Sequence, residues 1–214
     1  KITNVFFICT KEQEGQYNVT QTLKEIISHS NVKTIIIDEE TSGPYQTIMQ
    51  GIQKENISGA SIVCDCDHTL DVDGIFNIML SGDFDVVVPT WNITSEEWMN
   101  WSKVVLDEAN VVKMICEKER IESKDYTIQG IIGCIGFSDI EKVFVDDVSV
   151  YVSDALQKIL TENKTVKFVD PDYAQFYGTP EMLESYVNFL RKQCTILCDI
   201  DGVLLKHHPH SSCE

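Results

Sequence analysis

Apolar segments of strand length alternate with amphipathic segments through the first part of the chain, and this rhythm constrains the fold more than any other feature. ITNVFFI at residues 2–8 starts it, and further strands are expected at 33–38, 60–67 and 83–89. Helices are expected at 19–27, after the Gly-Pro turn of TSGPYQTIMQGIQ, and at 73–80. This β-α-β-α order predicts an α/β domain whose sheet is mostly parallel and covered on both faces.

The second half of the chain changes character. VVLDEANVVKMIC predicts a hairpin that turns at DEAN, and YTIQGIIGCIGF predicts a further extended run. A helix is expected at 148–160, a short strand in VKFVD, and then a helix capped by Thr179 with Pro180 at its first position. TILCDIDGVLL begins another strand and turn, so a domain boundary is expected at 191–194.

A net charge of −17 over 214 residues restricts the partners of the chain. An acidic surface repels phosphate backbones and anionic lipid, so we expect neither nucleic acid nor a membrane as a partner. No apolar run in the sequence approaches the roughly 20 residues that cross a bilayer. A nucleotide substrate would need a local basic side chain or a bound cation to offset this field.

The chain contains eight cysteines, most of them inside apolar runs such as SIVCDCD and TILCDID. This placement predicts buried free thiols and a reducing compartment, the cytoplasm. Cys194 and Cys198 have the spacing of half a zinc site, although their place in a predicted strand disfavours that alternative. The chain begins with Lys1 rather than Met, so we expect further sequence upstream.

The sequence CDCDH at residues 64–68 closes a predicted central strand. In open α/β sheets, ligands bind at the carboxyl ends of strands, where a carboxylate can hold Mg²⁺ against nucleotide phosphates. Alternation along the strand would put Asp65 and Asp67 on one face. The alternative is that these aspartates only cap the following loop.

Two shorter patterns could bind parts of a nucleotide or of its acceptor. TSGP at residues 41–44 precedes a predicted helix, and glycine lets the backbone approach an anionic ligand closely at a helix N-terminus. Glu117 and Lys118 end a predicted strand, where lysine could bind a phosphate and glutamate could bind sugar hydroxyls. A simple turn and a solvated ion pair are the alternatives.

Taken in order, a series of segments resembles the sugar-nucleotide pyrophosphorylases, whose nucleotidyltransferase domain has the GT-A fold. The resemblance covers about residues 3–190 and rests on order and spacing rather than on any single motif. The segments are FFICTKEQEGQYNVTQTL, TSGPYQTIMQG (T-x-G-x-A), CDCDHTLD (Gly-Asp or Ser-Asp), SKVVLDEANVVKMICEK, IGCIGF (G-x-Y-x-F), VYVSDALQKIL (E-Y-Y-x-T/S-D-A) and VKFVDPDYAQFYGTPEML.

The resemblance implies an enzyme that joins a nucleoside triphosphate to a phosphorylated sugar or similar small molecule and releases pyrophosphate, with Mg²⁺ as cofactor. It makes Asp67 and Lys118 the catalytic candidates, and a homo-oligomer is compatible with it. It implies that Asp67 binds the metal, Thr41 and Gly43 lie by the nucleotide base, Glu117 and Lys118 bind the sugar and its phosphate, and Gly133 lies in a substrate-binding strand.

Three departures from the family pattern bear on these roles. The opening strand and its G-x-G-x-R…K-P phosphate-binding loop are absent, since Lys1 aligns after them. Phe176 stands where relatives have a metal-binding Asp two residues before Gly-Thr. Val150 replaces the Glu of the E-Y-Y segment, which weakens the transfer of sugar-binding roles.

TILCDIDGVLL resembles motif I of the haloacid-dehalogenase (HAD) phosphatases, D-x-D-G-[TV]-L. The chemistry explains the spacing, because Asp199 would attack phosphorus and form an aspartyl phosphate while Asp201 would protonate the leaving oxygen and then activate water. Mg²⁺ would be held by Asp199 and Asp201 against the phosphate. A chance Asp-x-Asp-Gly loop is the alternative.

The sequence therefore predicts a nucleotidyltransferase domain at residues 1–192 that lacks its N-terminal segment, and the beginning of a HAD-like phosphatase domain at 193–214. Both activities are expected in one bifunctional chain. The alternative is that the phosphatase carries the only activity and that the GT-A domain is inactive, assembling or regulatory, which would agree with Phe176 and Val150. An intact G-x-G-x-R…K-P loop upstream would distinguish the two.

Overall fold

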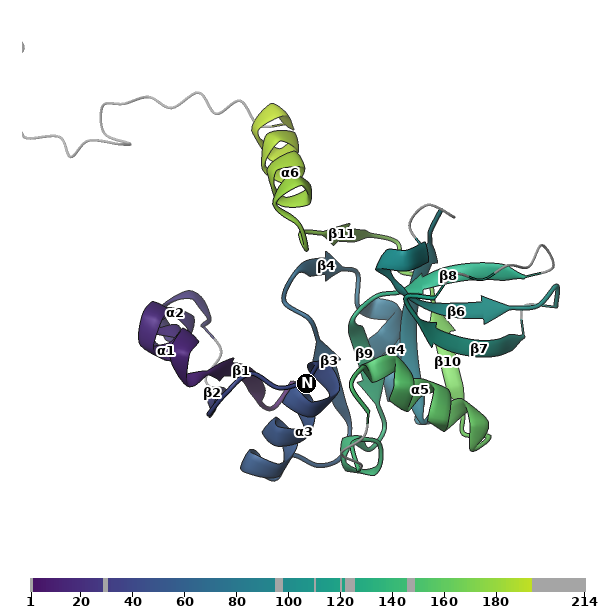
Figure 1. The fold of residues 1–214 in the computed structure, drawn as a ribbon, viewed down its shortest axis with the longest axis horizontal. Helices are drawn as coiled ribbons and strands as arrows, with labels where there is room; N and C mark the ends of the chain where they lie inside the picture. Colours follow the sequence, from purple (N-terminus) through teal and green to yellow (C-terminus); the bar gives the residue numbers. More distant parts are fainter. Residues whose placement is uncertain are drawn as a thin grey trace, which may run out of the picture. The chain divides into compact units, whose positions relative to one another are not determined.

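The computed structural model describes residues 2–28, 31–94, 98–109, 111–119, 121, 126–145 and 149–193. The chain divides into two compact units (Figure 1). The larger unit comprises Lys1–Cys66 and Leu70–Tyr173, and the smaller unit comprises Asp67–Thr69 and the chain from Ala174 onward. The expected beginning of a second domain, with Asp199 and Asp201, lies outside the described residues.

The main sheet of the larger unit is organised around one long strand, β5 (Val86–Asn92). The first half of β5 pairs antiparallel with β9 (Cys134–Phe137) and parallel with β10 (Val166–Val169), and its second half pairs antiparallel with β8 (Thr127–Ile131). The full order is β3-β9-β5-β8-β6-β7, where β3 is Ser61–Cys64, β6 is Ser102–Leu106 and β7 is Val112–Glu117.

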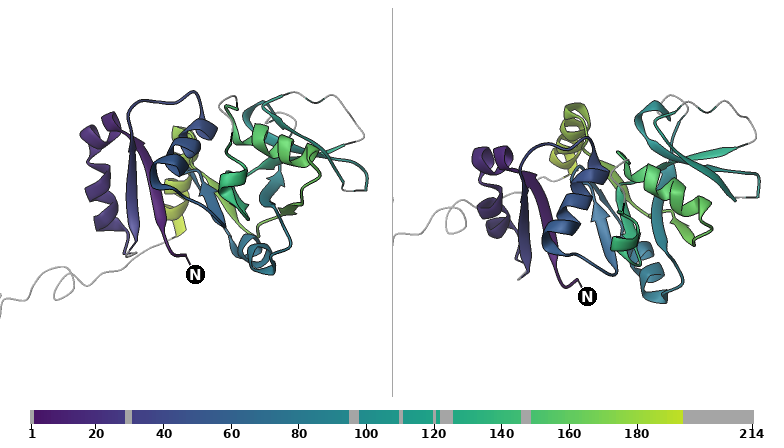
Figure 2. Two further views of the ribbon diagram at one scale, coloured as in Figure 1. Left: turned by 90° about the horizontal axis from the view of Figure 1, so that it is seen from below. Right: turned by 60° about the horizontal axis from the view of Figure 1, so that its bottom comes forward.

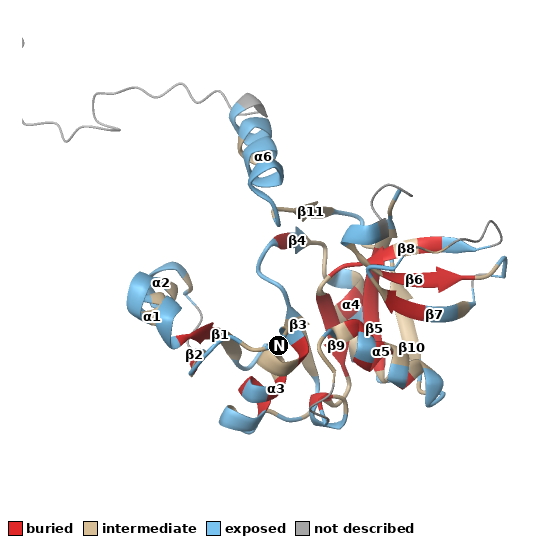
Figure 3. Cartoon of the chain, viewed as in Figure 1, coloured by how far each residue is buried: buried red, intermediate tan, exposed pale blue. Residues whose placement is uncertain are grey.

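Both faces of this sheet are covered by helices, because β5 is apolar on both sides. Val86 and Val88 point into one core, to which α3 (Pro44–Glu55) and α5 (Val152–Thr161) contribute. Val87 points into a second core on the other face, formed with α4 (Asp73–Ser81). Figure 2 shows α4 on the opposite side of the sheet from α3 and α5, and Figure 3 shows the buried residues concentrated in β5–β9.

A second, two-stranded sheet lies in the N-terminal part of the larger unit. Its parallel strands are β1 (Val5–Thr10) and β2 (Val32–Ile37), joined by α1 (Lys11–Tyr17) and α2 (Val19–Ile26). Neither α1 nor α2 contains a buried residue. Among the described strands, β1 pairs only with β2 and β3 pairs only with β9, so each of these two strands has one edge without a described partner.

Helix α3 connects the two sheets. Gly51 of α3 packs against Ile8 of β1 and Ile35 of β2, so closely that a Cβ at Gly51 would meet Ile8 at 2.6 Å. Tyr45 and Met49 of the same helix belong to the core of the main sheet. The amphipathic pattern of this segment therefore reflects two different packing partners.

The smaller unit is built around β4 (His68–Leu70), β11 (Ala174–Phe176) and α6 (Pro180–Gln193). Strands β4 and β11 pair with each other, and Tyr177 packs its ring on Tyr186 of α6 at 4.8 Å between centroids. As the sequence predicts, Pro180 is the first residue of α6, and the Thr179 hydroxyl accepts a hydrogen bond from the Met182 amide at 3.2 Å. Two short 3₁₀ helices, Trp98–Asn100 and Ile140–Lys142, complete the described elements.

The mixed α/β architecture is confirmed, and the differences from expectation have local causes. Among the described strands the antiparallel pairings outnumber the parallel ones, because the hairpin-rich second half contributes β6 to β9. The extended run expected at 126–137 is two strands, β8 and β9, which pair with different halves of β5. Helix α1 was not expected; the Thr10 side chain and Gln13 cap each other's backbone amides at its start. No helix in the described part of the chain combines the length and apolarity needed to cross a bilayer.

Candidate functional site

Glu117 is the last residue of β7, and two serine hydroxyls fix its carboxylate. Ser102 of β6 and Ser153 in the first turn of α5 both donate to Oε2, the latter at 2.6 Å. The Glu117 side chain remains 16% exposed, so it is held in one place yet reachable. Sequence reasoning missed both serines, although the predicted hairpin carries the signal for one of them, since Ser102 is the cross-strand partner of Glu117.

Lys118 follows directly and has an uncommon backbone conformation. Its φ of +43° lies in the left-handed region, and its amide donates to the Trp101 carbonyl at 3.2 Å. Its ammonium lies 3.7 Å from Glu117 Oε1 and 5.6 Å from the centre of the Tyr151 ring. Such backbone strain in a non-glycine residue concentrates at ligand-binding positions, because the surrounding structure must hold it.

A hollow of about 370 Å³ opens between β7 and the start of α5. Its polar lining consists mostly of hydrogen-bond acceptors, among them Glu117, which serine hydroxyls hold, and Asp154, which accepts from the Tyr151 amide. The full lining is Met114, Ile115, Cys116, Glu117, Glu119, Ser153, Asp154 and Gln157. A ligand rich in hydroxyl or amino groups would find acceptors here, and a hollow of this size holds a small molecule.

A buried lysine lies behind this hollow. Lys103 of β6 is fully buried, and its ammonium donates to the Trp101 carbonyl at 3.1 Å. Burial lowers the pKa of Lys103, while Cys116, Glu117 and Glu119 act in the opposite direction. Nothing in the alternating pattern of the hairpin distinguishes Lys103 from an exposed lysine.

Asp65 and Gly133 pack directly against each other. A Cβ at Gly133 would overlap the Asp65 carboxylate, and the Asp65 amide donates to the Gly133 carbonyl at 2.7 Å. Gly133 was singled out for a substrate-binding strand, and the structure gives it a second reason to be glycine. The carboxylate that requires this space belongs to Asp65 rather than to the metal candidate Asp67.

Replacing Gly133 with alanine is expected to destabilise the fold. The new methyl group must displace Asp65, and overpacking of this kind costs about 2 kcal/mol, or about 4–8 °C in Tm. Thermal unfolding followed by circular dichroism measures the shift.

The matched control is Gly15→Ala. Gly15 lies in α1 with no atom within 4 Å of an added Cβ, so alanine there should leave Tm unchanged or raise it slightly. An unchanged Tm in Gly133→Ala would contradict this prediction and would show that Asp65 can move aside without a loss of stability.

Asp67 lies in the smaller unit, beyond the end of β3. The strand ends at Cys64, so the prediction of a strand through residue 67, and with it the alternation argument for Asp65 and Asp67, is wrong. The Asp67 carboxylate is 56% exposed and lies 3.6 Å from His68 Nδ1. It also faces Gly178, where a Cβ would meet it at 2.7 Å.

The residues around Asp67 allow a partial metal site. Phe176 offers no ligand atom, and its ring lies 6.4 Å from the ring of His68. Mg²⁺ in nucleotide-dependent enzymes is commonly bound through one or two carboxylates, with water and substrate phosphates completing its shell. One exposed carboxylate against a glycine agrees with that arrangement.

Thr41 and Gly43 form a compact turn before α3. The Thr41 hydroxyl donates to the Gly43 carbonyl at 2.9 Å and lies 2.6 Å from the Thr47 hydroxyl. Gly43 faces the Val150 carbonyl, which a Cβ would meet at 2.6 Å, and the Tyr45 amide donates to that same carbonyl at 3.1 Å. The turn thus has a structural role, and its hydroxyl already has partners within the turn.

The cysteines differ from expectation in their burial. None of the five that the structure describes forms a disulfide bond, but only Cys9, Cys116 and Cys134 are buried, while Cys64 and Cys66 are exposed. Cys64 is the exposed last residue of the apolar strand β3, and Cys66 lies two residues beyond it. Cys194 and Cys198 lie outside the described residues.

Comparison with known proteins identifies the fold. No family model and no curated protein matches the chain. Among solved structures, a nucleoside-diphosphate-sugar pyrophosphorylase from Vibrio cholerae RC9 is similar, with a TM-score of 0.61 and 15% identity over 88% of this chain and 81% of that one. UDP-glucose pyrophosphorylase complexed with UDP-glucose gives 0.67 and 13% over 89% and 82%, and HddC from Yersinia pseudotuberculosis gives 0.60 and 19% over 88% and 79%. At these identities the likeness establishes a shared GT-A-like fold.

Proposed function

We propose that the protein is a nucleotidyltransferase that joins a nucleoside triphosphate to a phosphorylated sugar or similar small molecule and releases pyrophosphate. The observation that carries the proposal is Glu117, whose carboxylate is fixed in the lining of a hollow of about 370 Å³ and lies 3.7 Å from the Lys118 ammonium. Proteins of similar fold include enzymes named as pyrophosphorylases of nucleotide sugars. Position in the fold, backbone strain and chemistry at this pair agree with acceptor binding.

In the proposed mechanism, Lys118 binds the acceptor phosphate and Glu117 accepts hydrogen bonds from the acceptor's hydroxyls. The serine hydroxyls on Oε2 hold the Glu117 carboxylate in one orientation before the ligand arrives, which lowers the entropic cost of binding. The acceptor's phosphate oxygen then attacks the α-phosphorus of the nucleotide in line, and pyrophosphate leaves. The protein contributes mainly positioning and charge.

Asp67 is the residue that would hold Mg²⁺, which supplies positive charge to the nucleotide's phosphates. Thr41 and Gly43 are proposed to lie beside the base through the backbone of their turn, because the Thr41 hydroxyl is used within it. Gly133, the residue before β9, is proposed to bind substrate. These assignments rest on the resemblance and on the chemistry of each side chain.

We further propose that an upstream strand with a phosphate-binding loop completes the sheet between β1 and β3. Each of these strands has one edge without a described partner, and α3 packs under both sheets. Unpaired strand edges are costly to leave open, and a strand that pairs with both would join the two sheets into one. The basic loop would also supply the local positive charge that an acidic protein needs.

A second activity, phosphate-monoester hydrolysis by a HAD-type domain beginning near residue 193, is proposed on the motif at Asp199 and Asp201. The alternative keeps the phosphatase and makes the GT-A domain an inactive, assembly or regulatory module. Phe176, which offers no ligand atom and lies by His68, favours this alternative, whereas the fixed Glu117 carboxylate next to Lys118 favours a working transferase. Nucleotide-dependent release of pyrophosphate by the full-length protein, screened over nucleotides and sugar phosphates, distinguishes them.

Lys118→Ala is expected to raise the KM for the phosphorylated acceptor far more than the KM for the nucleotide. A hydrogen bond to a charged group contributes about 1.5–3 kcal/mol, which predicts a rise of roughly ten- to a hundredfold. The measurement is steady-state pyrophosphate release with each substrate varied in turn.

Lys113→Ala is the matched control, since Lys113 lies on β7, the strand that Lys118 follows, and pairs with Asp107 at 2.8 Å. Its kinetics should resemble wild type. Equal increases in both KM values for Lys118→Ala would contradict the assignment of Lys118 to the acceptor phosphate.

A further inference from the structure

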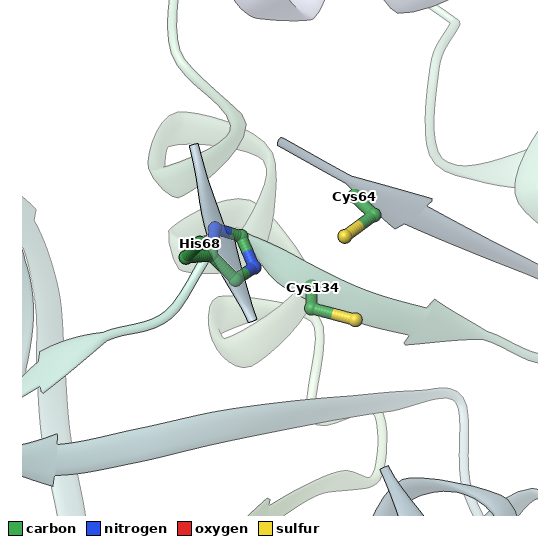
Figure 4. A group of neighbouring side chains, drawn as sticks. All are labelled: Cys64, His68 and Cys134. Carbon is green, nitrogen blue, oxygen red and sulfur yellow. The ribbon is translucent and has the colours of Figure 1, made fainter. Parts of the chain in front are cut away.

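Two cysteines face each other across neighbouring strands of the larger unit. Cys64, at the end of β3, is the cross-strand partner of Cys134, at the start of β9, and neither forms a disulfide bond. Their sulfur atoms lie within 4.8 Å of each other. Figure 4 shows the two side chains on their adjacent strands.

The backbone pairing brings these side chains as close as a sheet allows. The adjacent pair, Asp65 and Gly133, shares a backbone hydrogen bond, whereas the Cys134 amide donates to Ile132 instead of to β3. Cys64 and Cys134 therefore occupy a non-hydrogen-bonded position, where Cα atoms are about 4.5 Å apart. This spacing lies within the range of about 4.4–6.8 Å that a disulfide requires.

The two thiols differ in access. Cys64 is exposed, whereas Cys134 is 3% exposed. A hydrogen bond with Cys64, together with burial, raises the pKa of the Cys134 thiol. An incoming reagent therefore meets Cys64 first, and Cys134 is placed to react second.

We propose that Cys64 and Cys134 form a redox-active dithiol that small-molecule disulfides close to a cross-strand disulfide bond. The Cys64 thiolate attacks one sulfur of the reagent disulfide and forms a mixed disulfide with it. The S–S bond of the reagent breaks, and its other sulfur leaves as a thiolate. The Cys134 thiolate then attacks the Cys64 sulfur and expels the half of the reagent bound to it. The two protein thiols lose two electrons, the reagent disulfide gains them, and the two released thiolates take up the protons.

The bond would fix the end of β3, from which the chain continues directly into Asp65. Disulfides that are exposed on one side are readily reduced again, so the modification is reversible by thiols. Cys66 is the competing partner because it is also exposed and lies two residues from Cys64. A Cys64–Cys66 bond would close a very small ring, whereas Cys134 is already paired in register.

The test is treatment of the full-length protein with oxidised glutathione, followed by alkylation and peptide mapping by mass spectrometry. We expect a peptide cross-link between Cys64 and Cys134, a mass lower by about 2 Da from the loss of two hydrogen atoms, and reversal by dithiothreitol. In Cys134→Ala, a glutathione adduct should persist on Cys64. In Cys64→Ser, Cys134 should remain unmodified.

Cys66→Ser, Cys9→Ser and Cys116→Ser are the controls, and each should retain the cross-link. A Cys64–Cys66 bond in the wild type, or a glutathione adduct that persists on Cys64 while Cys134 is intact, would overturn the proposal. The Cys134→Ala variant keeps an apolar side chain at a buried position, so its folding can be verified by its Tm alongside the mapping.

Discussion

Asp67→Asn is expected to lower pyrophosphate release by the full-length protein at least about a hundredfold. The substitution keeps the shape of the side chain but removes the charge that would hold Mg²⁺ against the nucleotide's phosphates, and loss of such stabilisation costs this much or more. Because the Asp67 carboxylate is exposed, we expect the substitution to leave folding intact, which an unchanged Tm would verify. The measurement is turnover as a function of Mg²⁺ concentration.

Asp83→Asn is a suitable control for this experiment. Asp83 is also an exposed carboxylate, but it pairs with Lys167 at 3.4 Å, just before β5 begins. Its turnover should match wild type at every Mg²⁺ concentration. Near wild-type turnover of Asp67→Asn at saturating Mg²⁺ would remove Asp67 from the metal site.

Asp199→Asn is expected to abolish phosphate-monoester hydrolysis by the full-length protein while leaving nucleotidyl transfer intact. An amide cannot form the aspartyl phosphate, so no covalent intermediate can accumulate. The two activities are proposed to lie in different domains, and distant sites that share no partners do not couple. A paired assay of phosphate and pyrophosphate release on the same preparation measures both.

The reciprocal control is Asp67→Asn in the same paired assay, where phosphate release should persist. If phosphate release survives in Asp199→Asn, then Asp199 is not the nucleophile and the Asp-x-Asp-Gly sequence is only a loop. If transfer falls together with hydrolysis, the two domains are energetically linked and the boundary expected at 191–194 is wrong.

Short-range patterns predicted much of the fold. Apolar runs and helical spacing located β1, β2, α3, α4 and β10 to within a few residues, and the β6–β7 hairpin followed from its turn. These features depend on residues that are close in the sequence, because the spacing of apolar residues sets which face is buried and a few consecutive residues set the turn between two strands. The end of β3 was placed three residues too late, since CDCD continues an alternating pattern that the strand itself does not follow.

Contacts between segments far apart in the sequence could not be predicted from these local patterns. The sequence alone identified Glu117 and Lys118 as a pair, but only the structure shows that Ser153, from α5, orients Glu117. The same holds for Gly133, whose need for glycine comes from Asp65, the residue that follows β3.

The sequence by itself therefore determined the α/β class, most of the elements and the residue types available for chemistry, because each depends on local periodicity or composition. Tertiary structure alone decided which side chains meet. Strand β9 pairs antiparallel with β3, and this register brings Cys64 to Cys134 and Asp65 to Gly133. Register across a sheet is set by the packing of whole strands against both cores, and no single segment encodes it.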